Sequence, residues 1–240
     1  MREPVHFLPI LTTLIAIPFA WALFQRWRTR RSGPHLLWWA AGVFLYGAGT
    51  FTEASVTLFG WSEGLFRAWY ISGALLGGAP LAQGSAYLLL KRRTAHVLAW
   101  MLITFIAIAA TFVLLSPIDM TLVEPHRLSG SVLEWQRVRL FSPFVNTYAV
   151  IFLIGGAIWS AVRFYSKAET HHRAVGNTFI AVGAILPGVG GAATRMGHTE
   201  VLYVMELIGL VLIWIGFRYA IGAARSGPAV RGDAELVRSG

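Results

Sequence analysis

The segment AHVLAWMLITFIAIAATFVLLS, residues 95–116, decides the fold class. It contains no Asp, Glu, Lys or Arg, and it lies between the basic run Lys91-Arg92-Arg93 and Pro117. The hydrocarbon layer of a bilayer is about 30 Å thick, so a helix that crosses it needs about 20 mostly apolar residues. The segment is therefore predicted to be a transmembrane helix.

Six similar runs occupy most of the remaining chain. The predicted spans are residues 6–25, 36–59, 66–90, 95–116, 141–162, 175–196 and 201–221. Only 13% of all residues are charged, about half the share in soluble domains. The predicted fold is an all-α, polytopic membrane protein with a bundle of seven transmembrane helices in residues 1–221 and a flexible cytoplasmic tail in residues 222–240.

The basic residues predict the orientation of these spans. Lys and Arg in short loops resist translocation and therefore stay cytoplasmic. With the N-terminus outside, 14 of the 20 Lys and Arg residues lie on the cytoplasmic side. This predicts an integral protein of the cytoplasmic (plasma) membrane with its C-terminus inside. The net charge of +9 then belongs to a face that meets anionic lipid, and no separate basic patch indicates nucleic acid as a partner.

An internal repeat is a further prediction. When the chain is shifted by 141 residues, Gly42, Leu45, Gly47 and Gly49 align with identical residues, Gly183, Leu186, Gly188 and Gly190. The first three and last three spans would then form parallel repeats joined by the fourth span; the alternative is a chance match between Gly-rich helices. This 3+1+3 plan resembles that of the SWEET sugar transporters. The resemblance is one of architecture, because the chain has no Pro-Gln motif.

Small residues and prolines predict how the spans pack. Gly73 and Gly77 form a GxxxG motif, and Gly188 is a similar candidate for close helix contact. Pro80 and Pro187 fall in the middle of predicted spans and are expected to kink them.

Several kinds of chemistry are excluded by the residues present. The chain has no cysteine, so thiol catalysis and Cys-ligated metals are ruled out. The only lysines, Lys91 and Lys167, lie in predicted loops, which excludes a retinal Schiff base. No Asp lies in a span and no His pair is placed for haem, so no metal, cofactor or catalytic residue is predicted.

Three charged residues inside the spans are not explained by orientation. Glu53, Arg195 and Glu206 all fall in the outer third of the predicted bundle. Such charges are costly unless paired or hydrated and often mark functional sites. We expect an ion pair or triad at the base of an outward-facing pocket. Four other residues at this level complete the candidate ligand-binding set: Arg67, Tyr70, Asn146 and Tyr203.

The charges leave several functions open. The first is binding or transport of a small polar or zwitterionic solute, by a carrier or a receptor-like protein. A second is an accessory or sensor subunit of a larger membrane complex, or a homo-oligomer, in which the charges only lock helices together or Arg195 extends towards the headgroups. An intramembrane enzyme that uses Glu53 and Glu206 as acid and base ranks third.

Overall fold

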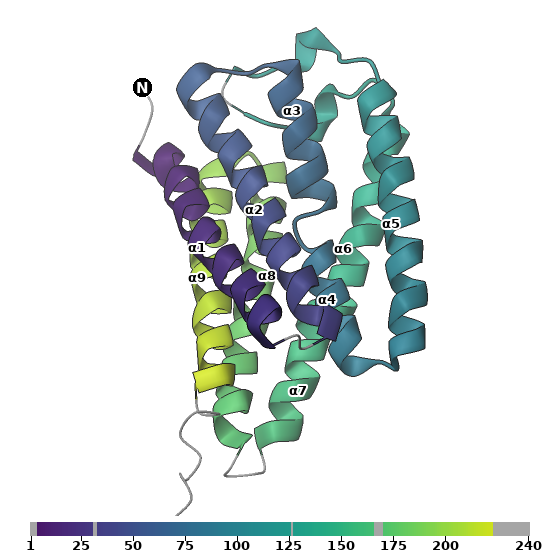
Figure 1. Cartoon of the computed structure of the whole chain (residues 1–240). Helices are drawn as coiled ribbons and strands as arrows, with labels where there is room; N and C mark the ends of the chain where they lie inside the picture. The colour runs from purple at the N-terminus through teal and green to yellow at the C-terminus, as the bar shows by residue number, and fades with distance from the viewer. Residues whose placement is uncertain (1–3, 31–32, 126, 166–169, 223–240) are drawn as a thin grey trace, which may run out of the picture.

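A computed structural model gives the structure of residues 4–30, 33–125, 127–165 and 170–222. The regular secondary structure of these residues is helical, without strands (Figure 1). Five helices are long and apolar enough to cross a membrane: Pro4–Arg30, Arg92–Leu115, Gln136–Tyr165, His171–Arg195 and Thr199–Ile221. To that extent the predicted all-α membrane class is confirmed. The predicted tail, apart from Gly222, lies outside the described residues.

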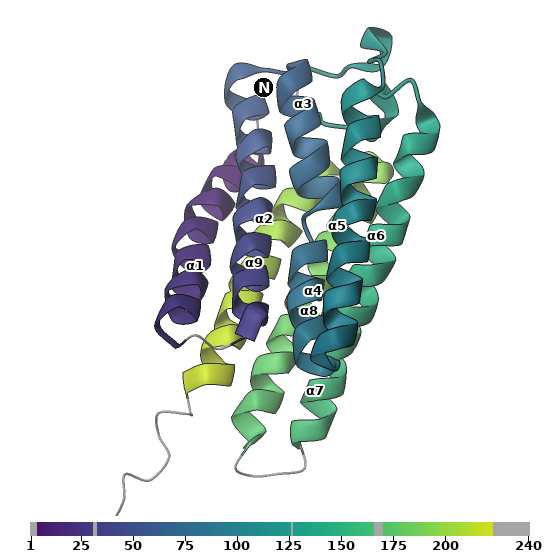
Figure 2. The same cartoon turned by 45° about the vertical axis from the view of Figure 1, so that its right-hand side comes forward.

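The described helices run up and down the long axis of the molecule (Figures 1 and 2). In chain order they are η1 (Pro4–Phe7), α1 (Leu8–Arg30), α2 (Gly33–Phe59), α3 (Glu63–Trp69), η2 (Tyr70–Leu75), α4 (Ala79–Leu89), α5 (Arg92–Leu115), η3 (Met120–Leu122), η4 (Gly130–Val132), η5 (Gln136–Leu140), α6 (Phe141–Ala149), η6 (Val150–Gly155), α7 (Gly156–Tyr165), α8 (His171–Arg195) and α9 (Thr199–Gly222). Of the short elements, η2 and η6 are π-helices and the others are 3-10 helices.

The predicted span 66–90 is not a continuous helix. Helix α3 passes directly into η2, the chain turns at residues 76–78, and α4 then begins at Ala79. Pro80 lies in the first turn of α4, where its missing N–H costs no helical hydrogen bond. The kink predicted at Pro80 is therefore wrong: the helix breaks before this residue. Pro187 does lie inside a helix, α8.

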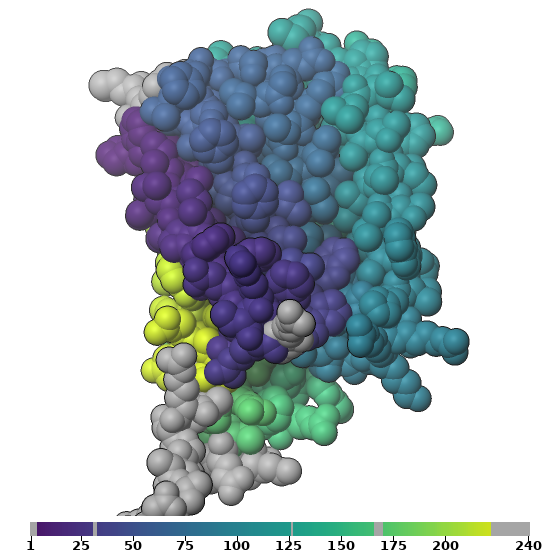
Figure 3. All heavy atoms as spheres, viewed as in Figure 1, coloured from purple at the N-terminus to yellow at the C-terminus, as the bar shows by residue number. Residues whose placement is uncertain are grey.

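Helix α2 is not one of the five helices that qualify as membrane spans by length and hydropathy. It packs against α1 on one side and against α3, η2 and α4 on the other (Figure 2). Its polar side chains Thr50, Thr52, Glu53, Ser55 and Thr57 are buried by these neighbours. Side chains also fill the spaces between the ribbons of α2, α4 and α5 on the face shown in Figure 3. A helix surrounded by protein can thus carry polar groups that a lipid-facing helix cannot.

Helices α8 and α9 form the most intimate contact in the bundle, and glycine makes it possible. Gly176 and Gly183 of α8 lie seven residues apart and face Gly216 and Gly209 of the antiparallel α9. A Cβ atom at Gly183 would be 2.6 Å from the carbonyl oxygen of Gly209, and one at Gly176 would be equally close to that of Gly216. The two backbones therefore touch directly, as small residues allow in membrane helices.

The segment between α5 and α6 covers one end of the bundle. Its buried side chains Leu128, Val132, Leu133 and Val138 pack in one cluster with Phe66. The N-terminal end of α1 lies at this same end of the molecule (Figure 1).

Candidate functional site

Glu53 and Glu206 lie side by side between α2 and α9. Glu53 is 4% exposed, and its carboxyl group is near enough to that of Glu206 for the two to interact electrostatically. The indole Nε1 of Trp69 donates to Oε1 of Glu53 at 2.9 Å. The Oε2 atoms of both glutamates are buried and accept no hydrogen bond from any other described group. The pair thus consists of a buried Glu53 and a half-buried Glu206, and Trp69 is the one side-chain donor to it among the described residues.

Tyrosines and threonines surround this pair. The Tyr46 hydroxyl donates to the backbone oxygen of Glu206 at 3.0 Å. This hydrogen bond joins α2 to α9. Tyr203, one turn before Glu206, is buried and packs edge-on against His6. Thr50 shares a hydrogen bond of 2.9 Å with Thr13 of α1. Groups from α2, α3 and α9 thus lie around the two glutamates, and α1 is joined to α2 beside them through Thr13.

Trp69 and Tyr46 are functional candidates that the sequence reasoning missed. A tryptophan near the end of an apolar run is typical of the membrane interface, and a single sequence gives no sign that the N–H of Trp69 points inwards. A signal for Tyr46 does exist. Tyr46, Thr50 and Glu53 follow the i, i+4, i+7 spacing of one helical face, so a polar stripe on α2 could have been predicted.

The ion pair predicted with Arg195 is not formed. Arg195 is exposed at the end of α8, and it makes no ion pair within the described chain. Helix α8 packs mainly against α7, η6 and α9 rather than α2. Its glycine face meets α9, and Arg195, five residues after Gly190, points about 140° away from that face. Equal depth in the bundle therefore did not bring Arg195 to Glu53.

Arg67 and Tyr70 have other partners than the carboxyl pair. The Arg67 guanidinium binds Glu63 at 2.6 Å and donates to the backbone oxygens of Val113 and Ser116 at the end of α5. Tyr70 is buried beneath the segment between α5 and α6, with its hydroxyl 3.5 Å from Ser142. Both residues therefore hold together the end of the bundle at which α3 begins and α5 ends.

Asn146 lies apart from the other candidates. It is exposed on α6. Of the predicted site residues, the structure brings together Glu53, Glu206 and Tyr203, whereas Arg195, Arg67, Tyr70 and Asn146 lie elsewhere.

We expect Arg67→Met to lower thermal stability without affecting the acidic pair. The substitution removes a cation from the C-terminal end of α5, where it stabilises free carbonyls by about 1 kcal/mol, so the melting temperature should fall by about 3 °C. Differential scanning fluorimetry of detergent-purified protein measures this. The control is Arg137→Met, since Arg137 is exposed on η5, between α5 and α6, and should be replaceable without loss. An unchanged melting temperature for Arg67→Met would contradict the structural role.

A second polar contact lies near the middle of the bundle. Gln83 of α4 is fully buried; its Nε2 donates to the Ala95 oxygen at 2.9 Å, and its Oε1 accepts from the Tyr148 hydroxyl at 2.5 Å. These bonds join α4 to α5 and α6. Both polar atoms of the Gln83 side chain are engaged in helix contacts, so Gln83 is a structural residue here.

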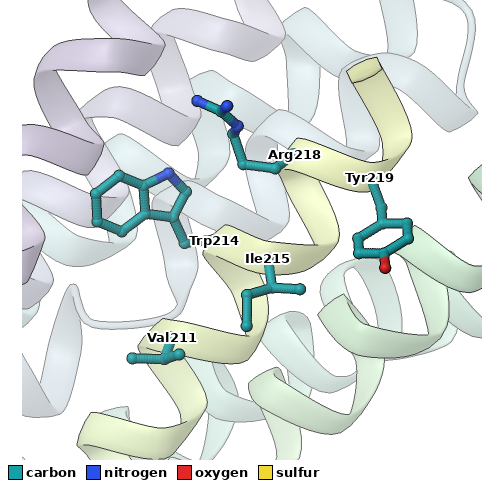
Figure 4. A pocket seen from close by; sticks show the side chains of 5 residues that line it. All are labelled: Val211, Trp214, Ile215, Arg218 and Tyr219. Atoms are coloured by element: carbon teal, nitrogen blue, oxygen red, sulfur yellow. The ribbon is translucent and has the colours of Figure 1, made fainter. Parts of the chain in front are cut away.

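A shallow hollow of about 380 Å³ lies along the C-terminal half of α9. Figure 4 shows that its lining side chains, Val211, Trp214, Ile215, Arg218 and Tyr219, all come from this one helix. The lining is apolar except for one guanidinium and one phenol, and it contains no acid. The hollow therefore has no part in the carboxyl pair, which lies nearer the start of α9.

Neither comparison with known proteins nor a search for metal-binding clusters identifies further site residues. Neither a family model nor a curated protein matches the chain. Within the described residues, no three His, Cys, Asp or Glu side chains gather closely enough to hold a metal ion. The functional argument therefore depends on the carboxyl pair itself.

Proposed function

We propose that this chain is a seven-helix protein of the cytoplasmic membrane that binds a small, positively charged polar solute at Glu53 and Glu206 and carries it across. The observation that carries the proposal is a pair of neighbouring carboxyl groups, each with a buried Oε2 atom, that form no ion pair with any Lys or Arg in the described part of the chain. A protein gains little stability from burying two acids together, because the cost of removing charge from water exceeds the return. Acids inside membrane bundles are instead typical of substrate and ion pathways.

The arrangement of the helices supports the proposed topology. Helix α1 begins and α9 ends at opposite ends of the molecule (Figure 1). Arg28, Arg30, Arg92 and Arg93 lie at the end opposite the start of α1. Basic residues gathered at one end favour that end as the cytoplasmic side. The broken helix α3–η2–α4 would then be the third span, interrupted where protein rather than lipid surrounds it.

The glycine contacts support the proposed repeat. Gly42 and Gly49 of α2 lie against the following helical segments, α4 and η2. Their aligned counterparts Gly183 and Gly190 lie in the same way against the following helix, α9. Matching roles at two matched positions favour a common plan for the two triplets of helices, with α5 as the connector.

The chemistry of the site favours a cation as the solute. Without Arg195 the site has no group that pairs with a solute carboxylate, so the zwitterionic solute considered from the sequence is disfavoured. Trp69, Tyr46 and Tyr203 lie around the two acids. Aromatic faces beside carboxylates are the usual surroundings of a bound ammonium group.

We expect Glu53→Gln and Glu206→Gln each to reduce uptake of radiolabelled methylammonium into proteoliposomes at least about tenfold. Each change removes a charged contact that typically contributes about 1.5–3 kcal/mol, and about 1.4 kcal/mol corresponds to a factor of ten in affinity. Glu134→Gln is the matched control, because Glu134 is exposed on the outer segment. Its uptake should equal that of the wild type.

Two outcomes would contradict the proposal. One is wild-type uptake of methylammonium by both Glu→Gln variants. The other is the absence of uptake by the wild type together with a large fall in melting temperature for both variants, which would make the pair a structural lock in an accessory or sensor subunit.

A further inference from the structure

We infer that the hollow along α9 binds one anionic phospholipid, with its phosphate at Arg218 and an acyl chain along Val211 and Ile215. The inference rests on the membrane location of α9, which is one of the five helices long and apolar enough to cross a bilayer. It does not depend on the solute proposed for Glu53 and Glu206.

The hollow faces away from the helix contacts of α9. Gly209 and Gly216 lie directly against α8. At about 100° per residue, Arg218 lies on the opposite side of α9 from both glycines. Ile215 and Arg218 are exposed, and all the lining side chains come from α9. Within the described part of the chain no second helix closes the hollow, so in a bilayer its neighbour is lipid.

Two aromatic side chains form the walls of the hollow. The Trp214 ring stacks on Phe19 of α1, with centroids 5.3 Å apart and an angle of 6° between the planes. The Tyr219 ring packs against Phe179 of α8, with centroids 5.8 Å apart. Figure 4 shows Trp214 and Tyr219 on opposite sides of α9, with Arg218 between them. Because each wall is held by a different neighbouring helix, the fold itself gives the hollow its shape.

The polar groups of the hollow lie at its C-terminal end. Arg218 is four residues before the end of α9, which is about 6 Å at about 1.5 Å per residue. Its guanidinium forms no ion pair with any described residue. A guanidinium presents a planar fork of donors that matches a phosphate, and the Tyr219 hydroxyl is a further donor beside it. No acid lines the hollow, so this end suits an anionic headgroup.

The rest of the lining is apolar. Val211 lies seven residues before Arg218, about 10 Å further along the helix towards its middle, and Ile215 lies between them. An acyl chain that follows this path buries apolar surface on both partners. A soluble anion would gain nothing from it, because such a ligand needs polar groups on several sides. A single charge at one end of an apolar path is typical of a site for an amphipathic ligand.

Other basic residues at this end of the bundle favour an anionic lipid. Helix α9 ends at the same end of the molecule as Arg28 and Arg92 (Figure 1). Arginines at a membrane surface attract acidic headgroups. They therefore raise the local concentration of such lipids beside Arg218.

Native mass spectrometry of the whole detergent-purified protein tests the site. The probes are dioleoyl phosphatidylglycerol, which is anionic, and dioleoyl phosphatidylcholine, which has the same chains and no net charge. The wild type should bind the first phosphatidylglycerol at least about tenfold more tightly than phosphatidylcholine. Arg218→Gln should abolish this preference, because a hydrogen bond to a charged group contributes at least about tenfold in affinity.

Two further variants separate a built site from general attraction. Arg163→Gln is the matched control: Arg163 is exposed in the last turn of α7, which ends at the same end of the bundle (Figure 1). It should keep the wild-type preference. Ile215→Trp retains the guanidinium and places a large ring over the apolar path. Because Ile215 is 38% exposed, the variant should fold normally and bind both lipids less tightly.

Three outcomes would overturn the lipid site. One is equal affinity of the wild type for the two lipids, and another is an equal loss in Arg218→Gln and Arg163→Gln. The third is a wild-type dimer that Ile215→Trp converts to a monomer, which would mean that a second copy of the chain covers the hollow. If Arg218→Gln fails to fold, Ile215→Trp decides instead, and unchanged binding of phosphatidylglycerol by that variant overturns the site.

Discussion

Gly183→Ala is expected to lower the melting temperature of the purified protein by about 10 °C. The new Cβ atom would lie 2.6 Å from the backbone oxygen of Gly209 and 3.0 Å from the backbone nitrogen of Ile213. Both contacts are with backbone atoms, so no side chain can rotate away and α8 and α9 must separate. Overpacking of this kind typically costs up to about 3 kcal/mol, and 1 kcal/mol corresponds to about 2–4 °C in a chain of this length.

The control for this experiment lies on the same helix. Gly188 is exposed, and a Cβ atom added there would have no neighbouring atom within 4 Å. Gly188→Ala should therefore leave the melting temperature unchanged or raise it, since alanine favours helix over glycine. Differential scanning fluorimetry of both variants in one detergent provides the comparison. Equal melting temperatures for Gly183→Ala and Gly188→Ala would refute the close contact between the two helices.

These two glycines also show what a sequence can predict about packing. Small residues predict close helix contacts in general, and the contacts of Gly176 and Gly183 agree with that. The place of Gly188 in a Gly-rich run predicts a packing role for it as well, yet this residue faces open space. Which face of a helix meets a neighbour depends on the partner helix. The seven-residue spacing of Gly176 and Gly183 becomes meaningful only once Gly216 and Gly209 of α9 are known to lie opposite them.

For the main chain, the long helices were predictable from the sequence, whereas the break within one predicted span was not. Long apolar runs predict the helices of residues 92–115 and 199–221, because hydrophobic length is a property of one segment alone. The break at residues 76–78 was not predicted. Two consecutive glycines before Pro80 are a local signal, but the neighbouring helices decide whether a helix bends or ends at such a point.

For the candidate site, depth was predictable and direction was not. Counting residues from the predicted span ends places Glu53, Glu206 and Tyr203 at one level, and the structure brings these three together. The same counting places Arg195 there, but its helix presents another face to the bundle. The ion pair expected between opposite charges is therefore not formed, and the charged neighbour of Glu53 is a second acid, Glu206.

Tyr148→Phe is expected to lower the melting temperature by about 6 °C through the buried Gln83. The hydroxyl of Tyr148 is the donor to Gln83 Oε1, and Gln83 is fully buried. Its removal leaves an unsatisfied acceptor inside the bundle, which costs about 2 kcal/mol and corresponds to about 6 °C. Tyr165→Phe serves as the control, because Tyr165 is 71% exposed and should tolerate the change.

A double substitution separates a lost hydrogen bond from a poorly packed ring. Replacing both polar partners with apolar groups of similar shape is nearly neutral, whereas replacing one is not. Gln83→Met in the Tyr148→Phe background should therefore restore most of the lost melting temperature, and the two effects should be far from additive. Additive losses in this cycle would mean that Gln83 and Tyr148 stabilise the bundle independently. Recovery would establish that one buried hydrogen bond links α4 to α6. Helix α4 is joined through η2 to Trp69, so this bond would also help to fix the position of the carboxyl pair.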